Sequence, residues 1–222
     1  MTLSKESQAR EDICRVGKSL FDRGYVHATA GNISVKLSDG FLITPTDACL
    51  GFLDPAKLAK LDTHAQHVSG DTPSKTIALH ARIYSATAQF DASISCVIHT
   101  HSRYCVALTL RPGGVELLAA LTPYFVMKVG RVPVVPYHRP GDAAAALAVA
   151  QAIKSYGDRA TPIRAVMLPR LGPNVWASSP MQAMAVLEEL EETARLACLN
   201  PDAAPLTALQ INELRRVFNA VW

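Results

Sequence analysis

The chain has 222 residues, of which 49% are hydrophobic and 18% charged, and its formal net charge is +3. This length suits one hydrophobic core, so we expect a single domain over residues 1–222. The positive charge forms no run of Lys or Arg, which argues against a nucleic-acid or membrane partner. A small anionic substrate is compatible with it.

Cysteine usage and the N-terminal segment predict a cytoplasmic protein. The five cysteines are scattered and include no Cys-x-x-Cys pair, so we expect them to be reduced and mostly buried. The first twelve residues are polar and unlike a signal peptide. No apolar stretch approaches the roughly 20 residues that cross a bilayer.

The first elements in chain order are a helix and a hairpin. Apolar residues recur at helical spacing from Ser4 to about Arg23, and Gly24 follows where a C-terminal cap belongs. The β-type runs GNISVKL and FLITP then flank Asp39-Gly40, a strong hairpin-turn signal. This part of the chain is predicted to be antiparallel.

A second helix is predicted from Thr72-Pro73-Ser74 through SKTIALHARIYSAT, and the run SISCVIH after it is predicted to be a strand. This strand should deliver His99 and His101 to its C-terminal end. Such a placement brings both imidazoles to the same end of the strand.

The second half of the chain mixes strands and helices, which indicates an α/β fold class. Strands are predicted at VPVVPY and RAVMLP, with a helix beginning near Asp142 between them. Ser179-Pro180 caps a long helix through MQAMAVLEELEETARLACL. A C-terminal amphipathic helix is expected at about residues 206–222, where it would pack on its own domain or on a neighbouring subunit.

The strongest chemical signal is the His-x-His pair formed by His99 and His101. Side chains two residues apart on a strand point to the same face, so both imidazoles can reach one cation. The alternative is a pair of ordinary polar residues at a strand end, and the spacing alone does not separate the two.

Three turns combine small hydroxyl side chains with accessible backbone amides, at residues 29–34 (TAGNIS), 44–47 (TPTD) and 73–75 (PSK). A glycine such as Gly31 lets the backbone approach a ligand closely. Together with the charge of Lys75 these turns suit a phosphate pocket. Any one of them alone would be an ordinary loop.

Seven motifs follow one another along the chain: TAGNIS, ITPTDACLG, SGDTPSKT, VIHTHS, TPYFVMKVG, VPVVPYHRPGD and LEELEETARL. In this order they resemble the class II aldolase/adducin-like family, most closely its branch of 3-oxo-tetronate 4-phosphate decarboxylases. The resemblance runs from about Arg10 to about Leu199. It implies a three-layer α/β/α sandwich around a mainly antiparallel sheet, and a homotetramer with sites near the subunit interfaces.

The resemblance also implies roles for single residues. His99 and His101 match two of the family's three histidine ligands for a divalent metal, usually zinc. The segments that hold the substrate phosphate in the family contain Gly31, Asn32, Thr46, Ser74 and Lys75.

Two positions depart from the family pattern. Thr76 stands where the family places a glutamate that acts as acid and base, and Leu171 stands where it places the third histidine. Two imidazoles alone are one ligand short of a usual catalytic zinc site, and the lost glutamate removes the obvious proton carrier.

Other histidines are candidates to fill the gap. His138 follows a β run and is the first candidate for a substitute ligand, although a histidine outside the metal site is the commoner outcome. His80 lies one helical turn after Thr76 and so shares its helix face. The remaining histidines, His27, His64 and His67, have no paired context and are predicted to be solvated loop residues.

The function expected from the resemblance is a metal-dependent carbon–carbon lyase, a decarboxylase or an aldolase, acting on a phosphorylated sugar or keto acid. Tyr124, Tyr137 or water would donate the final proton, and Arg139 would offset a second negative charge of the substrate. The alternative is a pseudoenzyme of the same fold that serves as a ligand-binding or partner subunit, because of Thr76 and Leu171.

Overall fold

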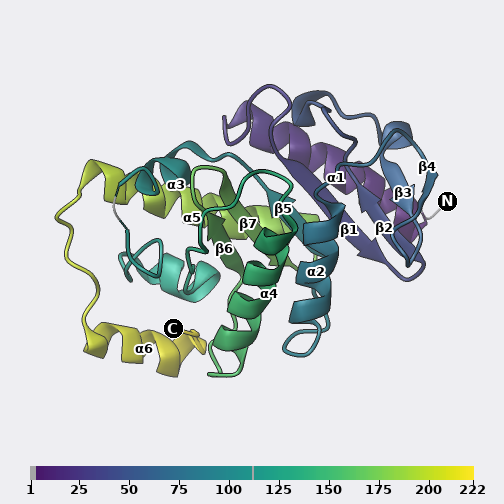
Figure 1. Cartoon of the computed structure of the whole chain (residues 1–222). Helices are drawn as coiled ribbons and strands as arrows, with labels where there is room; N and C mark the ends of the chain where they lie inside the picture. Colours follow the sequence, from purple (N-terminus) through teal and green to yellow (C-terminus); the bar gives the residue numbers. More distant parts are fainter. Residues whose placement is uncertain (1–3, 112) are drawn as a thin grey trace.

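A computed structural model describes residues 4–111 and 113–222 and has three layers, with helices on both faces of a seven-stranded sheet (Figure 1). The strand order is β4-β3-β2-β1-β5-β7-β6, and every neighbouring pair is antiparallel. The strands are β1 Asn32–Leu37, β2 Gly40–Ile43, β3 Ala59–Leu61, β4 His67–Ser69, β5 Cys96–His99, β6 Ala165–Leu168 and β7 Gly172–Ala177. The expected α/β/α sandwich with an antiparallel sheet is therefore confirmed.

The helices cover the two faces of the sheet in pairs. The α-helices are α1 Lys5–Asp22, α2 Ile77–Thr87, α3 Arg103–Leu108, α4 Ala143–Gly157, α5 Pro180–Leu199 and α6 Ala208–Phe218, with short turns η1 Leu50–Phe52, η2 Pro55–Lys57 and η3 Phe125–Val129. The larger core cluster packs α1 and α5 against one face, and a second cluster packs α2 and α4 against the other.

Strand alternation decides which side chains meet the second cluster. On β1, Ile33 and Val35 belong to the α1–α5 core, so Asn32 and Ser34 point to the α2–α4 face. On β5, Val97 belongs to the α2–α4 cluster, and His99 two residues later shares its face. The polar residues of the candidate site therefore lie on the α2–α4 side of the sheet.

Helix α1 and the β1–β2 hairpin begin and end within two residues of their predicted bounds, but α2 starts later than predicted. Ser74 N donates to Thr44 O over 3.2 Å, and Pro73 forms an isolated bridge with Pro45. This pairing holds residues 72–74 against the loop after β2, so the helix begins only at Ile77.

The predicted strand at VPVVPY is wrong, because only isolated bridges form there. Pro133 and Pro136 have no backbone N–H to donate to a ladder, and the contacts are a bridge from Pro133 to Glu116 and one from Val134 to Met167. The prediction also missed β3, β4, β7 and α3.

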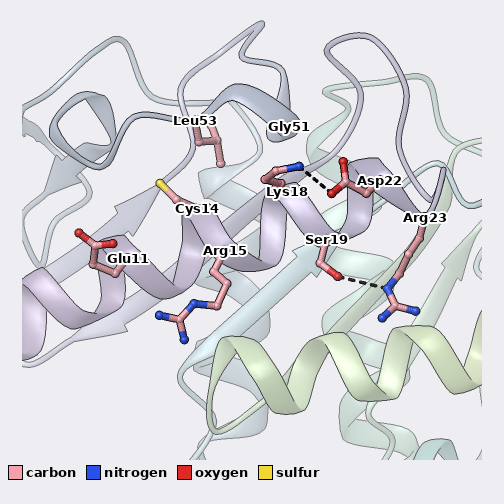
Figure 2. A pocket seen from close by; sticks show the side chains of 9 residues that line it. All are labelled: Glu11, Cys14, Arg15, Lys18, Ser19, Asp22, Arg23, Gly51 and Leu53. Carbon is pink, nitrogen blue, oxygen red and sulfur yellow. Dashed lines mark hydrogen bonds and ion pairs between the residues drawn. The ribbon is translucent and has the colours of Figure 1, made fainter.

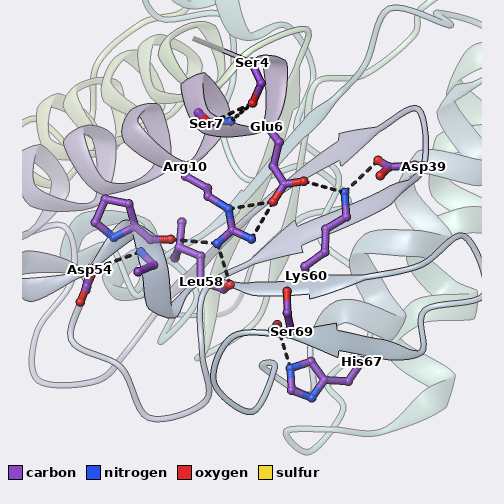
Figure 3. Close-up of polar contacts among 12 residues, drawn as sticks. Ser4, Glu6, Ser7, Arg10, Asp39, Asp54, Leu58, Lys60, His67 and Ser69 are labelled. Atoms are coloured by element: carbon purple, nitrogen blue, oxygen red, sulfur yellow. Dashed lines mark hydrogen bonds and ion pairs between the residues drawn. The ribbon is translucent and has the colours of Figure 1, made fainter.

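Lys60 ties the far edge of the sheet to the first helix (Figure 3). Its side chain is 8% exposed and its ammonium group lies 3.2 Å from Glu6 and 2.8 Å from Asp39. Arg10 pairs with the same Glu6 and donates to the carbonyl of Leu58, which is next to β3. A buried cation needs such partners, since an unpaired one would pay its full desolvation cost.

All five cysteines are free, as predicted, but only Cys96 and Cys105 are buried and the other three are partly exposed. In residues 4–111 and 113–222, every helix falls short of the length and apolar character that crossing a membrane requires.

Candidate functional site

His99 lies in the middle of a polar row that crosses three strands. The registers of β1–β5 and β5–β7 place Asn32, His99 and Asn174 side by side, and partners in register point to the same face. All three are buried, with exposed fractions of 7%, 8% and 0%. The row lies on the face that α2 covers.

The orientation of the His99 ring follows from one hydrogen bond. Its Nδ1 lies 3.0 Å from the carbonyl oxygen of Pro173. A carbonyl oxygen can only accept a hydrogen bond, so Nδ1 carries the proton and donates it to this bond. The lone pair of neutral His99 is then on Nε2. Histidine ligands of metals are commonly held in this way.

His101 lies two residues beyond the last residue of β5, so the predicted strand delivers His99 but not His101. The centroids of the two rings are nevertheless 5.1 Å apart, at an angle of 68°. Burial lowers the pKa of His99 to about 4, with a further contribution from His101. Burial also lowers the pKa of His101, so both rings favour the neutral form that binds metals.

His80 reaches the same region from α2. Its Nδ1 lies 2.7 Å from the hydroxyl of Ser34, which is 2.8 Å from the hydroxyl of Tyr84. Burial, together with the smaller effect of nearby His99, lowers the pKa of His80 to about 3. His80 is therefore a neutral, fully buried part of a hydrogen-bonded network beside His99.

Several buried polar atoms of this region have no hydrogen-bond partner in the described part of the chain. They are Asn32 Oδ1, His80 Nε2 and both amide atoms of Asn174. Native interiors rarely leave such atoms unpaired. Their gathering around His99 marks this face of the sheet as a place for polar groups from outside the chain.

The structure brings together the three turns that the sequence singled out. Thr46 N donates to Thr72 O over 2.9 Å, which joins the second turn to the third. Thr44 Oγ1 accepts from Ile33 N over 3.2 Å, which joins the second turn to the first. Ser74 is half-buried, whereas Thr46 and the charged Lys75 are exposed. The predicted phosphate residues thus share one end of the sheet.

Gly31 is needed where the first turn packs against the end of β5, because the backbone approaches His99 closely there. Its φ is +86°, and a Cβ at this position would lie 2.9 Å from the carbonyl oxygen of His99 and 2.8 Å from a methyl group of Val26. Any other residue would be strained here and would also push the turn away from His99.

Thr76 and Leu171, at the positions of the family's glutamate and third histidine, make contacts unrelated to metal binding. The hydroxyl of Thr76 lies 2.8 Å from that of Ser74 at the start of α2. Leu171 is half-buried and packs against the apolar cluster of α2 and α4. No set of three or more His, Cys, Asp or Glu side chains within residues 4–111 and 113–222 is arranged ready to hold a metal ion. The pair His99 and His101 fits a shared cation, but its expected third partner is absent.

The remaining predicted residues are not joined to the histidines by the contacts described. His138 is half-buried, and its Nε2 has no partner among the residues that the structure covers. Arg139 has a side chain that is 75% exposed, 3.9 Å from Asp142. Tyr124 and Tyr137 are 62% and 63% exposed. Their assigned roles remain predictions.

Two residues near the site were not among its predicted members. Asn174 lies in β7, which the sequence did not reveal as a strand. His27 is exposed, as predicted for a loop residue, but its ring centroid lies 6.2 Å from that of His101. The sequence signal that could have revealed His27 is its place in the segment just before β1. Because β1 pairs with β5 and Asn32 lies opposite His99, this segment must pass close to the C-terminal end of β5.

A separate open hollow of about 720 Å³ lies along α1 and contains none of these residues (Figure 2). Its walls carry both charge signs, from Glu11, Arg15, Lys18 and Asp22, and Lys18 and Asp22 already pair over 2.7 Å. This hollow therefore contributes nothing to the histidine site.

Comparison with known proteins defines the class. Residues 11–198 match the family model of the class II aldolase and adducin N-terminal domain. The structure also superposes on that of YgbL from Escherichia coli with a TM-score of 0.83, at 37% identity, covering 96% of this chain and 100% of that one. An L-fuculose 1-phosphate aldolase shares the fold, with a TM-score of 0.79 at 22% identity and 98% of each chain covered.

The chain belongs to the class II aldolase and adducin family. A protein of Cupriavidus necator named 3-oxo-tetronate 4-phosphate decarboxylase is 50% identical to it, covering 99% of this chain and 100% of the relative. A protein of Escherichia coli K12 with the same name is 40% identical, covering 95% and 96%. The resemblance inferred from the motifs is therefore confirmed.

Proposed function

We propose that the protein is a carbon–carbon lyase of the class II aldolase type that decarboxylates a phosphorylated 3-oxo acid, with a divalent metal bound by His99 and His101. The observation that carries this proposal is the pair of neutral imidazoles at the end of strand β5, whose ring centroids are 5.1 Å apart. It is supported by full-length relatives named 3-oxo-tetronate 4-phosphate decarboxylase.

The substrate class explains why Thr76 is tolerable. A 3-oxo acid loses its carboxyl group as CO2, the electron pair passes toward the neighbouring carbonyl, and a proton then takes the place of the carboxyl group. A divalent metal held by His99 and His101 would supply a Lewis acid for that carbonyl. No base has to remove a carbon-bound proton first, so the glutamate missing at position 76 matters less than it would in an aldolase.

The chain's own residues then bind and orient the substrate. The joined turns around Gly31, Thr46 and Ser74 hold the phosphate, and exposed Lys75 adds a positive charge. Asn32 offers an unpaired amide oxygen next to His99, suited to a substrate hydroxyl. Tyr124 and Arg139 are exposed, so roles for them require a neighbouring subunit or a closed loop. A cytoplasmic homotetramer, as expected for the family, would provide such a neighbour.

A second candidate is a pseudoenzyme that binds a phosphorylated ligand without turning it over. The observation in its favour is that Leu171 packs into an apolar cluster while no ready group of three ligands stands in the described ranges 4–111 and 113–222.

The decisive experiment supplies 3-oxo-tetronate 4-phosphate and measures CO2 together with the remaining three-carbon ketose phosphate. The lyase proposal expects release by the parent with added zinc and none by His99→Ala. A parent that binds the substrate but releases nothing, while Thr76→Glu with Leu171→His gains activity, would establish the pseudoenzyme.

A further inference from the structure

Ser102 stands at the N-cap position of α3, but its side chain does not cap the helix. Its hydroxyl lies 2.6 Å from that of Thr100 instead, and both residues are fully buried. An N-cap side chain normally accepts from the second or third N–H group of its helix. In α3 these groups belong to Tyr104 and Cys105, so they need an acceptor from elsewhere.

Glu191 of α5 provides that acceptor. Helix α5 lies beside α3 (Figure 1), and one carboxylate oxygen of Glu191 accepts from Tyr104 N over 2.9 Å while the other accepts from Cys105 N over 3.0 Å. The side chain is buried, and hydrogen bonds to a carboxylate are stronger there than in water. Both oxygens of Glu191 are thus used on the turn that follows His101 in the chain.

The residue before His101 is held by β7. Thr100 N donates to Pro173 O over 3.3 Å. Gly172 lies so close to Thr100 that a Cβ on this glycine would be 1.8 Å from the carbonyl oxygen of Thr100. His101 itself lies beyond the end of β5, so its place depends on two fixed points, one at Thr100 and one at Tyr104.

The stretch between these two fixed points is short. Three residues, 101 to 103, separate them, so the stretch has few conformations while both points hold. In this arrangement the ring centroid of His101 lies 5.1 Å from that of His99. A helix of six residues such as α3 has little stability of its own, so loss of Glu191 would release the second fixed point.

We propose that Glu191 is a positioning residue for the histidine pair, because its capping of α3 holds the ring of His101 against that of His99. The inference rests on the proposed function, in which these two imidazoles bind a divalent metal. The carboxylate acts through the backbone of α3, since its two oxygens already accept from Tyr104 and Cys105.

The first test measures the ring geometry in protein that a chelator keeps free of metal. Histidine is labelled with 13C and 15N, and nuclear Overhauser effects are recorded between the ring protons of His99 and His101. The variants are Glu191→Gln, which replaces one acceptor by an NH2 group, and Glu191→Asp, which keeps the charge on a shorter side chain. The controls are Glu192→Gln, an exposed neighbour, and Thr207→Ala, which removes the cap of α6.

We expect the contact between the two rings in the parent and in both controls. It should disappear in Glu191→Gln and weaken in Glu191→Asp, and circular dichroism shows that each variant is folded. A parental ring contact in folded Glu191→Gln would overturn the positioning role and leave Glu191 only a capping role.

The second test adds zinc and 3-oxo-tetronate 4-phosphate. Glu191→Gln should bind zinc about 10–100-fold more weakly, as is usual when a group that orients a metal ligand is removed. The kcat should fall while KM changes little, because the phosphate turns are not altered. An equal loss of zinc affinity in Thr207→Ala would overturn the proposal, since lost stability alone would then explain it. A parent that binds no zinc and releases no CO2 would overturn the proposed function alone, because the ring contact in the metal-free protein still decides the role of Glu191.

Discussion

His80 is a buried histidine whose neutral form the fold requires. Its environment contains the hydroxyls of Ser34 and Tyr84 and the ring of His99, and no carboxylate is among its described partners. Burial lowers its pKa from 6.5 to about 3. Protonation would therefore place an unpaired charge inside the α2–α4 layer, which the surrounding groups cannot compensate.

This pKa shift predicts a loss of stability in acid. Between pH 6.5 and about 3 the unfolded chain carries a proton on His80 that the folded chain does not, so the free energy of unfolding decreases as the pH falls. The decrease is about 1.4 kcal/mol for each pH unit well inside this window, and His99 acts in the same direction. In the His80→Asn variant, the free energy of unfolding should fall less steeply as the pH falls, because the contribution of His80 is missing.

Urea unfolding between about pH 5 and pH 7, in the presence of a chelator, measures the two slopes of stability against pH. The substitution also alters the hydrogen bond to Ser34, but this changes the stability by the same amount at every pH. It therefore does not affect the comparison of the slopes. Equal slopes in the parent and in His80→Asn would show that His80 does not titrate as its burial requires.

The buried amide of Asn174 has no hydrogen-bond partner in the part of the chain that the structure describes, so we expect its removal to stabilise the protein. The residue is fully buried in β7, and both amide atoms lack a partner among the described residues. Asn174→Val keeps a similar volume and suits a strand, so the free energy of unfolding should rise by about 1–3 kcal/mol. Asn174→Asp should lower it, since it would bury a charge. Destabilisation by valine in chemical unfolding would mean that the amide is hydrogen-bonded in solution.

At the scale of elements, α3 depends on a carboxylate from another helix. Glu191 of α5 is 4% exposed and accepts from the N–H groups of Tyr104 over 2.9 Å and Cys105 over 3.0 Å. These N–H groups belong to the first turn of α3, where a helix needs acceptors and favours negative charge. Glu191 thereby fixes the short helix that follows His101.

The Glu191→Gln variant replaces one acceptor by an NH2 group that faces an N–H donor. We expect the free energy of unfolding to fall by about 2 kcal/mol, because a charge-assisted bond is lost and a buried donor remains unpaired. The matched control is Glu192→Gln, its exposed neighbour, which should change stability by less than about 0.5 kcal/mol. Similar losses in both variants would contradict the capping role.

Elements with strong local signals could be predicted, and those formed by tertiary contacts could not. The Ser4 cap and the apolar spacing of α1 are local, as is the Asp39-Gly40 turn. Strand β7 contains Gly172, Pro173 and Asn174, which are depleted in strands, and it forms because β5 and β6 flank it. Strand β3 has only three residues, one of them the buried Lys60.

For the whole molecule, site residues with a local sequence signal could be predicted, and those brought together by tertiary contacts could not. His99 and His101 are found from their spacing, and the three turns from their composition. His27 was missed because it meets His101 only through the pairing of β1 with β5, which joins segments more than 60 residues apart in sequence. Long-range pairing of this kind leaves no local pattern.

The last segment of the chain completes the larger core. After α5 an extended stretch leads to α6, and Leu206 N donates to Ala120 O over 2.7 Å. Figure 1 shows α6 at the lower left of the molecule, well separated from the end of α5. Trp222 is 9% exposed, its ring lies 5.7 Å from that of Phe125, and the guanidinium of Arg131 lies 5.0 Å above it.

Trp222→Ala should therefore destabilise the whole fold. Removing a buried Trp side chain costs about 3–5 kcal/mol, and we expect the lower end because the site is at the edge of the core. Phe218→Ala is the control from the same segment, since Phe218 is 56% exposed and its loss should cost less than about 1 kcal/mol. Urea unfolding followed by tyrosine fluorescence and by circular dichroism measures both. If Trp222 anchors the tail to the common core, the two probes report one shifted transition, whereas an unchanged midpoint would mean that the segment from α6 onward unfolds independently of the sheet.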